Sequence, residues 1–236
     1  MQRTRYGMEL TENQELWPSD YFNKRFPELS RELMSLAAFS SYPANVALFA
    51  ERDESRGVHL ILEGEIKLSI NSRDGRRLSL RIAHKGEMLG LVSTLSGGRY
   101  EMTAETLYPA RMALISRREF LAFLSRHPQV YHFLSDELTR DFTMACEQLR
   151  TVALAPSAPK KLARLLLDWS ENGQMADQET KVRFSMTHEE IGEFIGTSRE
   201  TVTRILNSFK SKQLVALRGS TLTIPNKAAL AEYAGG

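Results

Sequence analysis

The chain has 236 residues, of which 42% are hydrophobic and 25% are charged, and its formal net charge is +2. This length is enough for two modest domains, and the composition is typical of a globular protein rather than a disordered or fibrous one. The small net charge does not by itself indicate a nucleic-acid partner. An anionic partner must therefore be bound by a local arrangement of side chains.

Several classes of protein are excluded by what the sequence lacks. Cys146 is the only cysteine, so the chain cannot form an internal disulfide or supply a four-cysteine metal cluster. The N-terminal residues are charged and do not read as a secretory signal, and no apolar run approaches the roughly 20 residues of a membrane helix. Phosphate-loop, HExxH, CxxC and nucleophile-elbow motifs are absent. We therefore expect a cytoplasmic protein with no catalytic residue, no metal site and no membrane partner.

The first half of the chain is expected to form short helices followed by an antiparallel β-structure. Residues 26–39 can form helices, and from Val46 to Ile115 short β-like segments alternate with turn residues. Asp74-Gly75 is the strongest hairpin signal, and Pro109 divides a second pair of strands. This spacing of strands and turns is typical of an antiparallel barrel or sandwich.

A long helical pattern runs from about Ser116 to Val152. From His127 onward an uninterrupted helix would be about 39 Å long, which is more than a small domain needs for its own core. The later apolar residues recur at steps of four and three, the spacing of a coiled-coil seam: Leu138, Phe142, Ala145, Leu149 and Val152. We prefer a homodimer seam; the alternative is a helix packed on its own barrel. Two prolines at positions 156 and 159 then predict a hinge.

Residues 186–209 have the pattern of two helices joined by a tight turn. Each helix start carries a threonine and a glutamate three residues apart, which fits a capping box: Thr187 with Glu190, and Thr197 with Glu200. The apolar inner faces of the two helices are expected to consist of Ile191, Ile195, Val202, Ile205, Leu206 and Phe209.

Two glycines and a polar front complete this motif. Gly192 lets the second helix cross closely, and Gly196 can adopt the left-handed conformation that the turn requires. The side opposite the apolar face is polar at the start of the second helix, where Ser198, Arg199, Glu200, Thr201 and Arg204 stand. A helix-turn-helix protein inserts this end into the DNA major groove, where arginine can bind guanine and glutamate can bind cytosine. The alternatives are that Glu200 only closes a capping box and that the arginines are solvated.

A short β-wing is expected after the second helix. In residues 214–224 two strand-like segments meet at Arg218-Gly219-Ser220, and Arg218 is a candidate phosphate contact or an ordinary turn residue. His188 is expected at the surface. Residues 160–236 contain 11 Lys or Arg and 9 Asp or Glu, so DNA binding must come from where the arginines lie.

Residues 189–206, EEIGEFIGTSRETVTRIL, resemble the Crp–Fnr superfamily of bacterial transcription regulators, the relatives of the cyclic-AMP receptor protein. The resemblance extends over roughly residues 35–230. It implies an α+β fold: an N-terminal cyclic-nucleotide-binding-like antiparallel β-barrel (jelly roll), a long dimerisation helix and a C-terminal winged helix-turn-helix. It also implies base contacts from Arg199, Glu200 and Arg204, phosphate contacts from Ser198 and Thr201, and a palindromic site with half-sites of the TGTGA or TGA type.

The sensor half departs from the pattern of the cyclic-AMP binders. The resemblance implies that those proteins have a phosphate-binding cassette in which a glutamate follows a glycine and an arginine precedes a Ser/Thr-Ala pair. The corresponding residues of this chain are Leu91, after Gly90, and Met102, before Thr103-Ala104. An apolar side chain cannot neutralise a buried phosphate, so we expect cyclic-AMP binding to be lost or much weakened. The remaining pocket candidates are Gly86, Gly90, Arg99, Thr103 and Cys146.

No cofactor is predicted, and the effector stays unidentified. Iron–sulfur sensing would need several N-terminal cysteines, and haem sensing would need axial ligands, for which His59, His84, His127 and His132 are candidates by residue type only.

The predicted domains are residues 1–125 (helices and barrel sensor), 126–153 (dimerisation helix), 154–159 (hinge) and 160–236 (winged helix-turn-helix). The predicted function is a homodimeric, sequence-specific transcription regulator that binds double-stranded DNA. Its sensor would bind an effector other than cyclic AMP, or none, and an activator would also contact RNA polymerase. The alternatives are a module that still responds to a cyclic nucleotide and one whose C-terminal unit contacts proteins.

Overall fold

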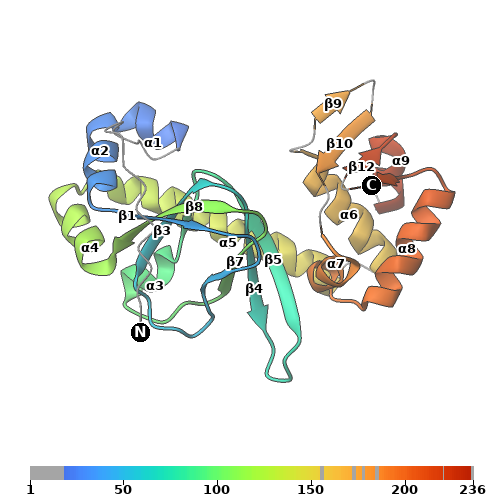
Figure 1. Cartoon of the computed structure of the whole chain (residues 1–236), viewed down its shortest axis with the longest axis horizontal. Helices are drawn as coiled ribbons and strands as arrows, with labels where there is room; N and C mark the ends of the chain where they lie inside the picture. Colours follow the sequence, from blue (N-terminus) through green and yellow to red (C-terminus); the bar gives the residue numbers. More distant parts are fainter. Residues whose placement is uncertain are drawn as a thin grey trace.

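The computed structural model describes residues 19–154, 157–171, 174–176, 179–183, 186–219 and 221–234. In these ranges the chain forms an N-terminal β-rich unit and a smaller C-terminal unit, and one long helix extends from the first toward the second (Figure 1). The N-terminal helices, which cover one end of the β-rich unit, are α1 (Asp20–Arg25) and α2 (Pro27–Ser35).

The β-rich unit consists of two antiparallel four-stranded sheets. The first has the order β1-β8-β3-β6 and the second the order β2-β7-β4-β5. The strands are β1 (Ala38–Tyr42), β2 (Ala47–Phe49), β3 (Gly57–Glu63), β4 (Ile66–Asn71), β5 (Arg77–Ala83), β6 (Met88–Leu89), β7 (Thr103–Thr106) and β8 (Ala110–Ser116), and helix α3 (Leu91–Ser96) follows β6. The expected antiparallel β-fold is confirmed, as two sheets rather than one closed barrel.

Side chains between the sheets form the core of this unit, because alternate residues of each strand face inward. Ile61, Ile66 and Met112 are almost fully buried there. A second cluster packs the first sheet against helices and includes Phe22, Leu60, Phe120 and Phe123.

The β4–β5 hairpin turns through residues 72–76, as the Asp74-Gly75 signal predicted, with Gly75 at φ +82°. The pairing shifts register along this hairpin: Ser69 lies opposite Ser79, but Leu68 lies opposite Arg81. Leu80 is therefore an extra residue on β5, that is, a β-bulge.

Two expectations about element boundaries were wrong. The helical stretch expected over residues 26–39 ends at Ser35, because residues from Ala38 onward pair with β8 as strand β1. The pattern over 116–152 forms two helices, α4 (Arg117–Arg126) and α5 (Val130–Leu154), because Pro128 interrupts it. Helix α5 still has 25 residues, which gives a length of about 37 Å.

The residues of the predicted dimer seam lie along α5 but differ in exposure. Phe142 is 71% exposed and Leu149 is 65% exposed, and Ala145 is exposed as well. Leu138 and Val152 are half-buried against their own chain, Leu138 on the helix-covered core. The middle of the seam is thus an apolar stripe open to a partner, whereas its ends also serve the fold of one chain.

The C-terminal unit packs helices against a four-stranded antiparallel sheet of order β11-β12-β10-β9. Its elements are α6 (Ala158–Glu171), β9 (Gln174–Ala176), β10 (Glu179–Arg183), α7 (His188–Ile195), α8 (Arg199–Ser211), β11 (Ala216–Arg218), β12 (Thr221–Ile224) and α9 (Lys227–Ala234). The expected wing strands β11 and β12 are confirmed, and β12 also pairs with β10, which the sequence pattern did not predict. None of the described helices has the length and apolarity needed to cross a membrane.

Candidate DNA-reading surface and sensor cavity

Helix α7 begins with the predicted capping box. The Thr187 hydroxyl accepts a hydrogen bond from the Glu190 backbone N–H at 3.2 Å, and the Glu190 carboxylate accepts one from the Thr187 backbone N–H at 2.9 Å. This reciprocal pair satisfies backbone donors that the helix itself leaves free, so α7 starts at a defined residue.

The turn between α7 and α8 depends on two glycines, as predicted. A Cβ atom on Gly192 would lie 2.6 Å from the carbonyl oxygen of Thr197, so only glycine allows this close approach. Gly196 ends α7 in the left-handed conformation at φ +63°, and its N–H donates to the Gly192 carbonyl. Together they fix the angle at which α8 leaves the turn.

The capping box expected between Thr197 and Glu200 is wrong by one residue. The N-cap of α8 is Ser198, whose hydroxyl accepts from the Thr201 backbone N–H at 3.3 Å. Thr197 instead belongs to the turn, where its N–H donates to the Gly192 carbonyl at 2.9 Å. Hydrogen bonds from its own backbone N–H and from the Ser198 hydroxyl lower the pKa of Glu200, so its carboxylate stays ionised.

Helix α8 has one buried and one exposed face. Its apolar residues are nearly all inaccessible to solvent within the C-terminal core: Val202, Ile205, Leu206 and Phe209. On the other face Ser198, Arg199, Glu200 and Arg204 are exposed and Thr201 is half-buried. Among the described residues no ion pair holds either guanidinium. The polar front of α8 is therefore free to meet an anionic or hydrogen-bonding partner.

The structure adds residues to this surface that the sequence reasoning missed. A shallow open hollow along α8 is lined by Arg199, Glu200, Thr203, Arg204 and Asn207. The spacing of positions 199, 203 and 207, one helical turn apart, could have identified Thr203 and Asn207. His188 is half-buried and lies between the two helices, with Nδ1 2.7 Å from the Thr203 hydroxyl. Burial, and then Lys210 and Arg199, lower the pKa of His188.

Arg218 lies apart from this helix, exposed at the end of β11 beside Gly219. Ser220, the last residue of the predicted bend, lies outside the described residues. The wing therefore presents an exposed basic side chain of its own, separate from those of α8.

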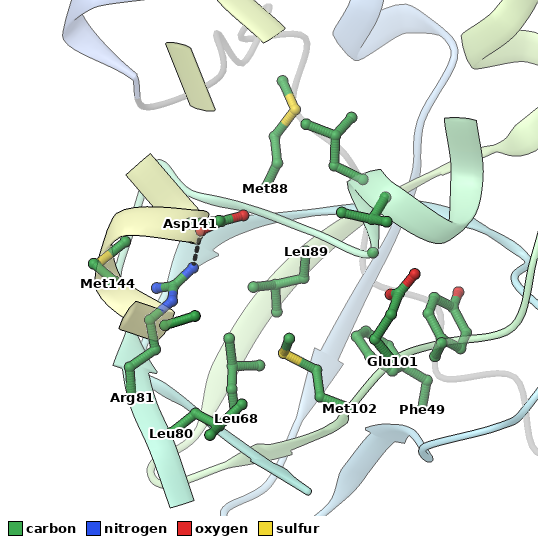
Figure 2. Close-up of a pocket in the computed structure, with 15 residues that line it drawn as sticks. Phe49, Leu68, Leu80, Arg81, Met88, Leu89, Glu101, Met102, Asp141 and Met144 are labelled. Carbon is green, nitrogen blue, oxygen red and sulfur yellow. Dashed lines mark hydrogen bonds and ion pairs between the residues drawn. The ribbon is translucent and has the colours of Figure 1, made fainter. Parts of the chain in front are cut away.

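The sensor unit contains an apolar cavity of about 70 Å³ between its sheets, α3 and α5 (Figure 2). Most of its lining is hydrophobic: Phe49, Leu68, Leu80, Met88, Leu89, Leu91, Val92, Met102, Met144 and Ala145. Leu91 and Met102 thus face the cavity at the positions where the sequence lacks the acidic and basic residues of the cyclic-AMP binders.

The one guanidinium that lines the cavity is already neutralised. Arg81 bonds to the carboxylate of Glu87 and, at 2.7 Å, to that of Asp141. Burial raises the pKa of Asp141, although Arg81 opposes this effect, and burial likewise raises the pKa of Glu137 nearby. Glu101 adds another carboxylate to the lining. The charged part of the cavity is therefore acidic rather than basic, and it disfavours an anionic ligand.

Of the five predicted pocket residues, Gly90 lines this cavity. Gly86 sits in a turn at φ +90°, the Thr103 hydroxyl accepts from the Glu51 N–H, and Cys146 is half-buried on α5. Arg99 lines a separate, more polar hollow next to the buried His59, where its guanidinium donates to the Arg52 carbonyl at 2.7 Å. The described residues include no group of three or more His, Cys, Asp or Glu that could hold a metal ion.

Two family models match the chain. Residues 160–233 match the Crp-like helix-turn-helix domain, and residues 39–127 match the cyclic nucleotide-binding domain. Together they span both units and leave α5 between them.

Individual proteins show the same likeness over most of their length. The transcriptional activatory protein AadR of Rhodopseudomonas palustris is 28% identical over 204 residues, which are 86% of this chain and 80% of AadR. The cyclic AMP receptor protein of Thermus thermophilus is 27% identical over 195 residues, which are 83% of this chain and 87% of that protein. The structure of FixK2 from Bradyrhizobium japonicum has the same fold, with a TM-score of 0.74, 20% identity, and coverage of 84% of this chain and 96% of FixK2.

The close approach at Gly192 can be tested directly. We expect Gly192→Ala to destabilise the C-terminal unit by about 1–3 kcal/mol, because the new methyl group meets backbone that can yield only by moving the turn. Thermal unfolding followed by circular dichroism measures this effect. Glu189→Ala, an exposed change in the same helix, is the control and should cost well under half as much. Equal stability of Gly192→Ala and the unmodified protein would contradict the described turn.

Proposed function

Because this chain belongs to the CRP/FNR family of transcription regulators, with a DNA-binding helix-turn-helix and a sensor domain, we propose that it acts as a homodimer on a palindromic DNA site. The observation that carries the proposal is the polar front of α8, which is exposed and free of ion pairs within the described residues while its opposite face anchors the helix. A partner with hydrogen-bonding edges and negative charge fits this front.

Arg199, Glu200 and Arg204 are the proposed base readers. Each guanidinium can donate two hydrogen bonds to O6 and N7 of a guanine, and the ionised Glu200 can accept one from N4 of a cytosine. These residues support half-sites of the TGTGA or TGA type. Ser198 and Thr201, at the positive end of the helix dipole, and Arg218 on the wing are the proposed phosphate contacts.

Dimerisation through α5 is the second part of the proposal. A large apolar side chain such as Phe142, left 71% exposed on a long helix, is stabilised when a second copy covers it. Leu138, Phe142, Ala145, Leu149 and Val152 form the proposed seam. Two chains joined along this seam would carry two copies of α8, as a palindromic site requires.

The proposed effector is small, uncharged and mainly apolar. The cavity is hydrophobic, its only guanidinium is held by Glu87 and Asp141, and Glu101 adds negative charge. A cyclic nucleotide would place its phosphate near Leu91 and Met102 without a counter-charge, at a cost of several kcal/mol. Gly90 lines this cavity, and the other residues predicted for the effector site are proposals to be tested by substitution: Gly86, Arg99, Thr103 and Cys146.

The remaining parts of the proposal concern domains, place and partners. The domain boundaries 1–125, 126–153, 154–159 and 160–236 follow the same order as the two family matches. The protein would act in the cytoplasm, where bacterial DNA is accessible. If the bound protein activates transcription, as the name of AadR says of that relative, RNA polymerase is a further partner.

The base readers can be tested by substitution. We expect Arg199→Ala or Arg204→Ala to cost about 1–3 kcal/mol on the preferred site and to relax the choice at one base pair, because one bidentate contact is lost. Arg218→Ala should instead weaken binding to all duplexes equally. It should also reduce the slope of log affinity against log salt concentration by about one, because one phosphate contact is lost. Selection of sites from random DNA, followed by titration, measures both. A uniform loss for Arg199→Ala on every sequence would contradict its role as a base reader.

The seam can be tested by introducing charge at its most exposed residues. We expect Phe142→Glu with Leu149→Glu to give monomers, because four carboxylates would face one another in the dimer. Operator affinity should fall about 100-fold or more as the second half-site is lost. Sedimentation measures the mass, and Glu147→Ala, on the same helix and exposed, is the matched control. A dimer that survives the double change would contradict the seam.

The effector class predicts that cyclic AMP has no effect. A ligand at 100 times its Kd stabilises the folded state by about 2.7 kcal/mol. We expect millimolar cyclic AMP to leave both the melting temperature and the operator affinity unchanged. The cyclic AMP receptor protein of Thermus thermophilus serves as the reference in the same assay. A raised melting temperature of this protein with cyclic AMP would overturn the proposed effector class.

A further inference from the structure

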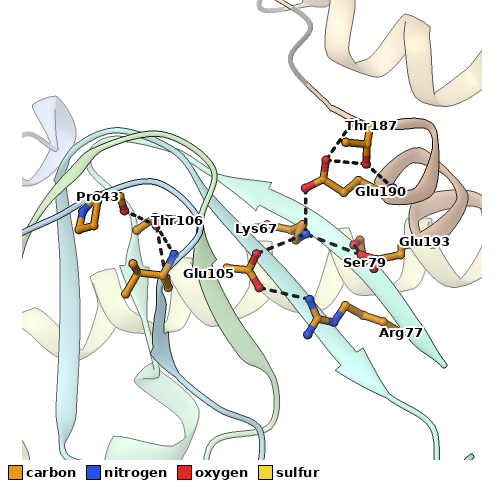
Figure 3. A network of polar contacts seen from close by, with 10 residues as sticks. Pro43, Lys67, Arg77, Ser79, Glu105, Thr106, Thr187, Glu190 and Glu193 are labelled. Atoms are coloured by element: carbon orange, nitrogen blue, oxygen red, sulfur yellow. Dashed lines mark hydrogen bonds and ion pairs between the residues drawn. The ribbon is translucent and has the colours of Figure 1, made fainter. Parts of the chain in front are cut away.

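A buried lysine joins the sensor unit to the C-terminal unit. Lys67 on β4 is only 2% exposed, and its Nζ lies 3.2 Å from the carboxylate of Glu190 and 3.8 Å from that of Glu193, both on α7. Glu105, its cross-strand neighbour on β7, lies 3.7 Å away (Figure 3). One ammonium group is thus shared between a carboxylate of its own unit and two carboxylates of the other.

Hydrogen bonds from uncharged donors reinforce this contact. The Ser79 hydroxyl on β5 donates to Glu193 at 3.0 Å. The side-chain amide of Gln148 on α5 donates to two carbonyls, that of Ser79 and that of Phe194, at 2.9 Å each. Three elements, β5, α5 and α7, therefore meet at one point. We call Lys67, Ser79, Gln148, Glu190 and Glu193 the interdomain clamp.

The charges of the clamp are held in place by their neighbours. Burial alone would raise the pKa of Glu190, but the backbone N–H of Thr187 and the charge of Lys67 bring it below its ordinary value, so this carboxylate stays ionised. Arg77 pairs with the other oxygen of Glu105 at 3.2 Å. Without the Lys67 charge, Glu105 would face Glu190 and Glu193 with no cation between the two units.

The orientation of the C-terminal unit depends on such contacts. Helix α5 ends at Leu154 and helix α6 begins at Ala158, so the two units are carried by separate helices. Helix α7 faces β5, and α8 lies on the side of the C-terminal unit that is farther from the sheets (Figure 1). Holding α7 on the sensor unit therefore fixes the direction in which α8 presents its arginines.

We infer that the interdomain clamp sets the half-site spacing that the dimer accepts, with Lys67 as the positioning residue. The inference rests on the proposed homodimer. Two recognition helices must reach half-sites about 34–36 Å apart, and one added base pair moves a half-site by about 3.4 Å and rotates it by about 35°. A C-terminal unit clamped to its sensor unit tolerates such a change poorly, whereas a loosened one can follow it.

The experiment compares four variants on a series of palindromes whose central spacer differs by one base pair at a time. Lys67→Met removes the cation. Glu190→Gln with Glu193→Gln removes the two charges that α7 contributes to the clamp, while the amides can still accept hydrogen bonds, including that of the capping box. The triple variant combines all three changes. Lys85→Met, an exposed lysine of the same sensor unit, is the matched control.

The unmodified protein and the control variant Lys85→Met should bind one spacer length best. Both should lose affinity steeply when the spacer is shorter or longer. For Lys67→Met we expect about tenfold weaker binding at the best spacer, because at any time only a fraction of the molecules holds α8 in the required direction. The plot of affinity against spacer length should also be flatter. The triple variant should bind more tightly than Lys67→Met, because the unpaired carboxylates of α7 are gone. The double variant, which keeps Lys67 beside Glu105 but lacks the two carboxylates of the clamp, should lie between the unmodified protein and Lys67→Met. A merely structural role of Lys67 would not produce this order.

A second measurement does not depend on DNA. Cys146 is first replaced by serine, and new cysteines at the exposed positions 85 and 232 carry spin labels. The distance between the two labels reports the distance between the two units. Labelled chains are diluted into an excess of unlabelled ones, so that only distances within one chain are measured. The distance distribution should be narrow in the unmodified background and broad with Lys67→Met. Folded Lys67→Met dimers with an unchanged spacer profile, or with tighter binding, would overturn the inference. If no duplex is bound by the unmodified protein, the proposed function fails, and the distance distribution still decides whether Lys67 holds the two units together.

Discussion

Helix α7 is packed on both of its sides, and the arrangement of the whole chain depends on this. One side buries Ile191, Phe194 and Ile195 in the C-terminal core, and the other presents Glu190 and Glu193 to Lys67 of the sensor unit. Because Gly192 lets the turn that leads to α8 pack closely against α7, the position of α7 also determines that of α8. The surface proposed to bind DNA is therefore positioned by contacts made on the opposite side of the motif.

This packing places acidic and basic side chains of the C-terminal unit on different sides of the helix-turn-helix motif. Its basic and acidic residues nearly balance in number, so no strong overall field would attract DNA. Two acidic side chains of α7, Glu190 and Glu193, are however partly buried against Lys67, whereas the arginines of α8 stay in solvent. A nearly neutral unit can thus present two unpaired guanidinium groups on α8, because two of its carboxylates are held by its own sensor unit.

Local signals in the sequence were sufficient for the parts of the structure that depend on neighbours in the chain. The Thr187 capping box, the Gly192–Gly196 turn and the hairpin at Asp74-Gly75 are each encoded within a few residues. The exact cap of α8 could not be predicted, because Thr197 and Ser198 are both good caps and the demand of the turn decides between them. The clamp was unpredictable for another reason: Lys67 and Glu190 are 123 residues apart, and within an alternating strand Lys67 looks like an ordinary solvent-facing lysine. The separate hollow that Arg99 lines was not predicted either, because sequence distance alone does not tell which hollow a loop side chain lines.

The bulge at Leu80 lets strand β5 line the cavity and contact the C-terminal unit at the same time. In a regular strand successive side chains alternate between faces, so Leu80 and Arg81 could not both line the cavity while Ser79 and Ile82 contact the C-terminal unit. One inserted residue resolves this conflict. The contact between the cavity and the C-terminal unit therefore depends on the number of residues in β5 as much as on their identity: without the extra residue, either Arg81 would turn away from the cavity or Ser79 would turn away from Glu193.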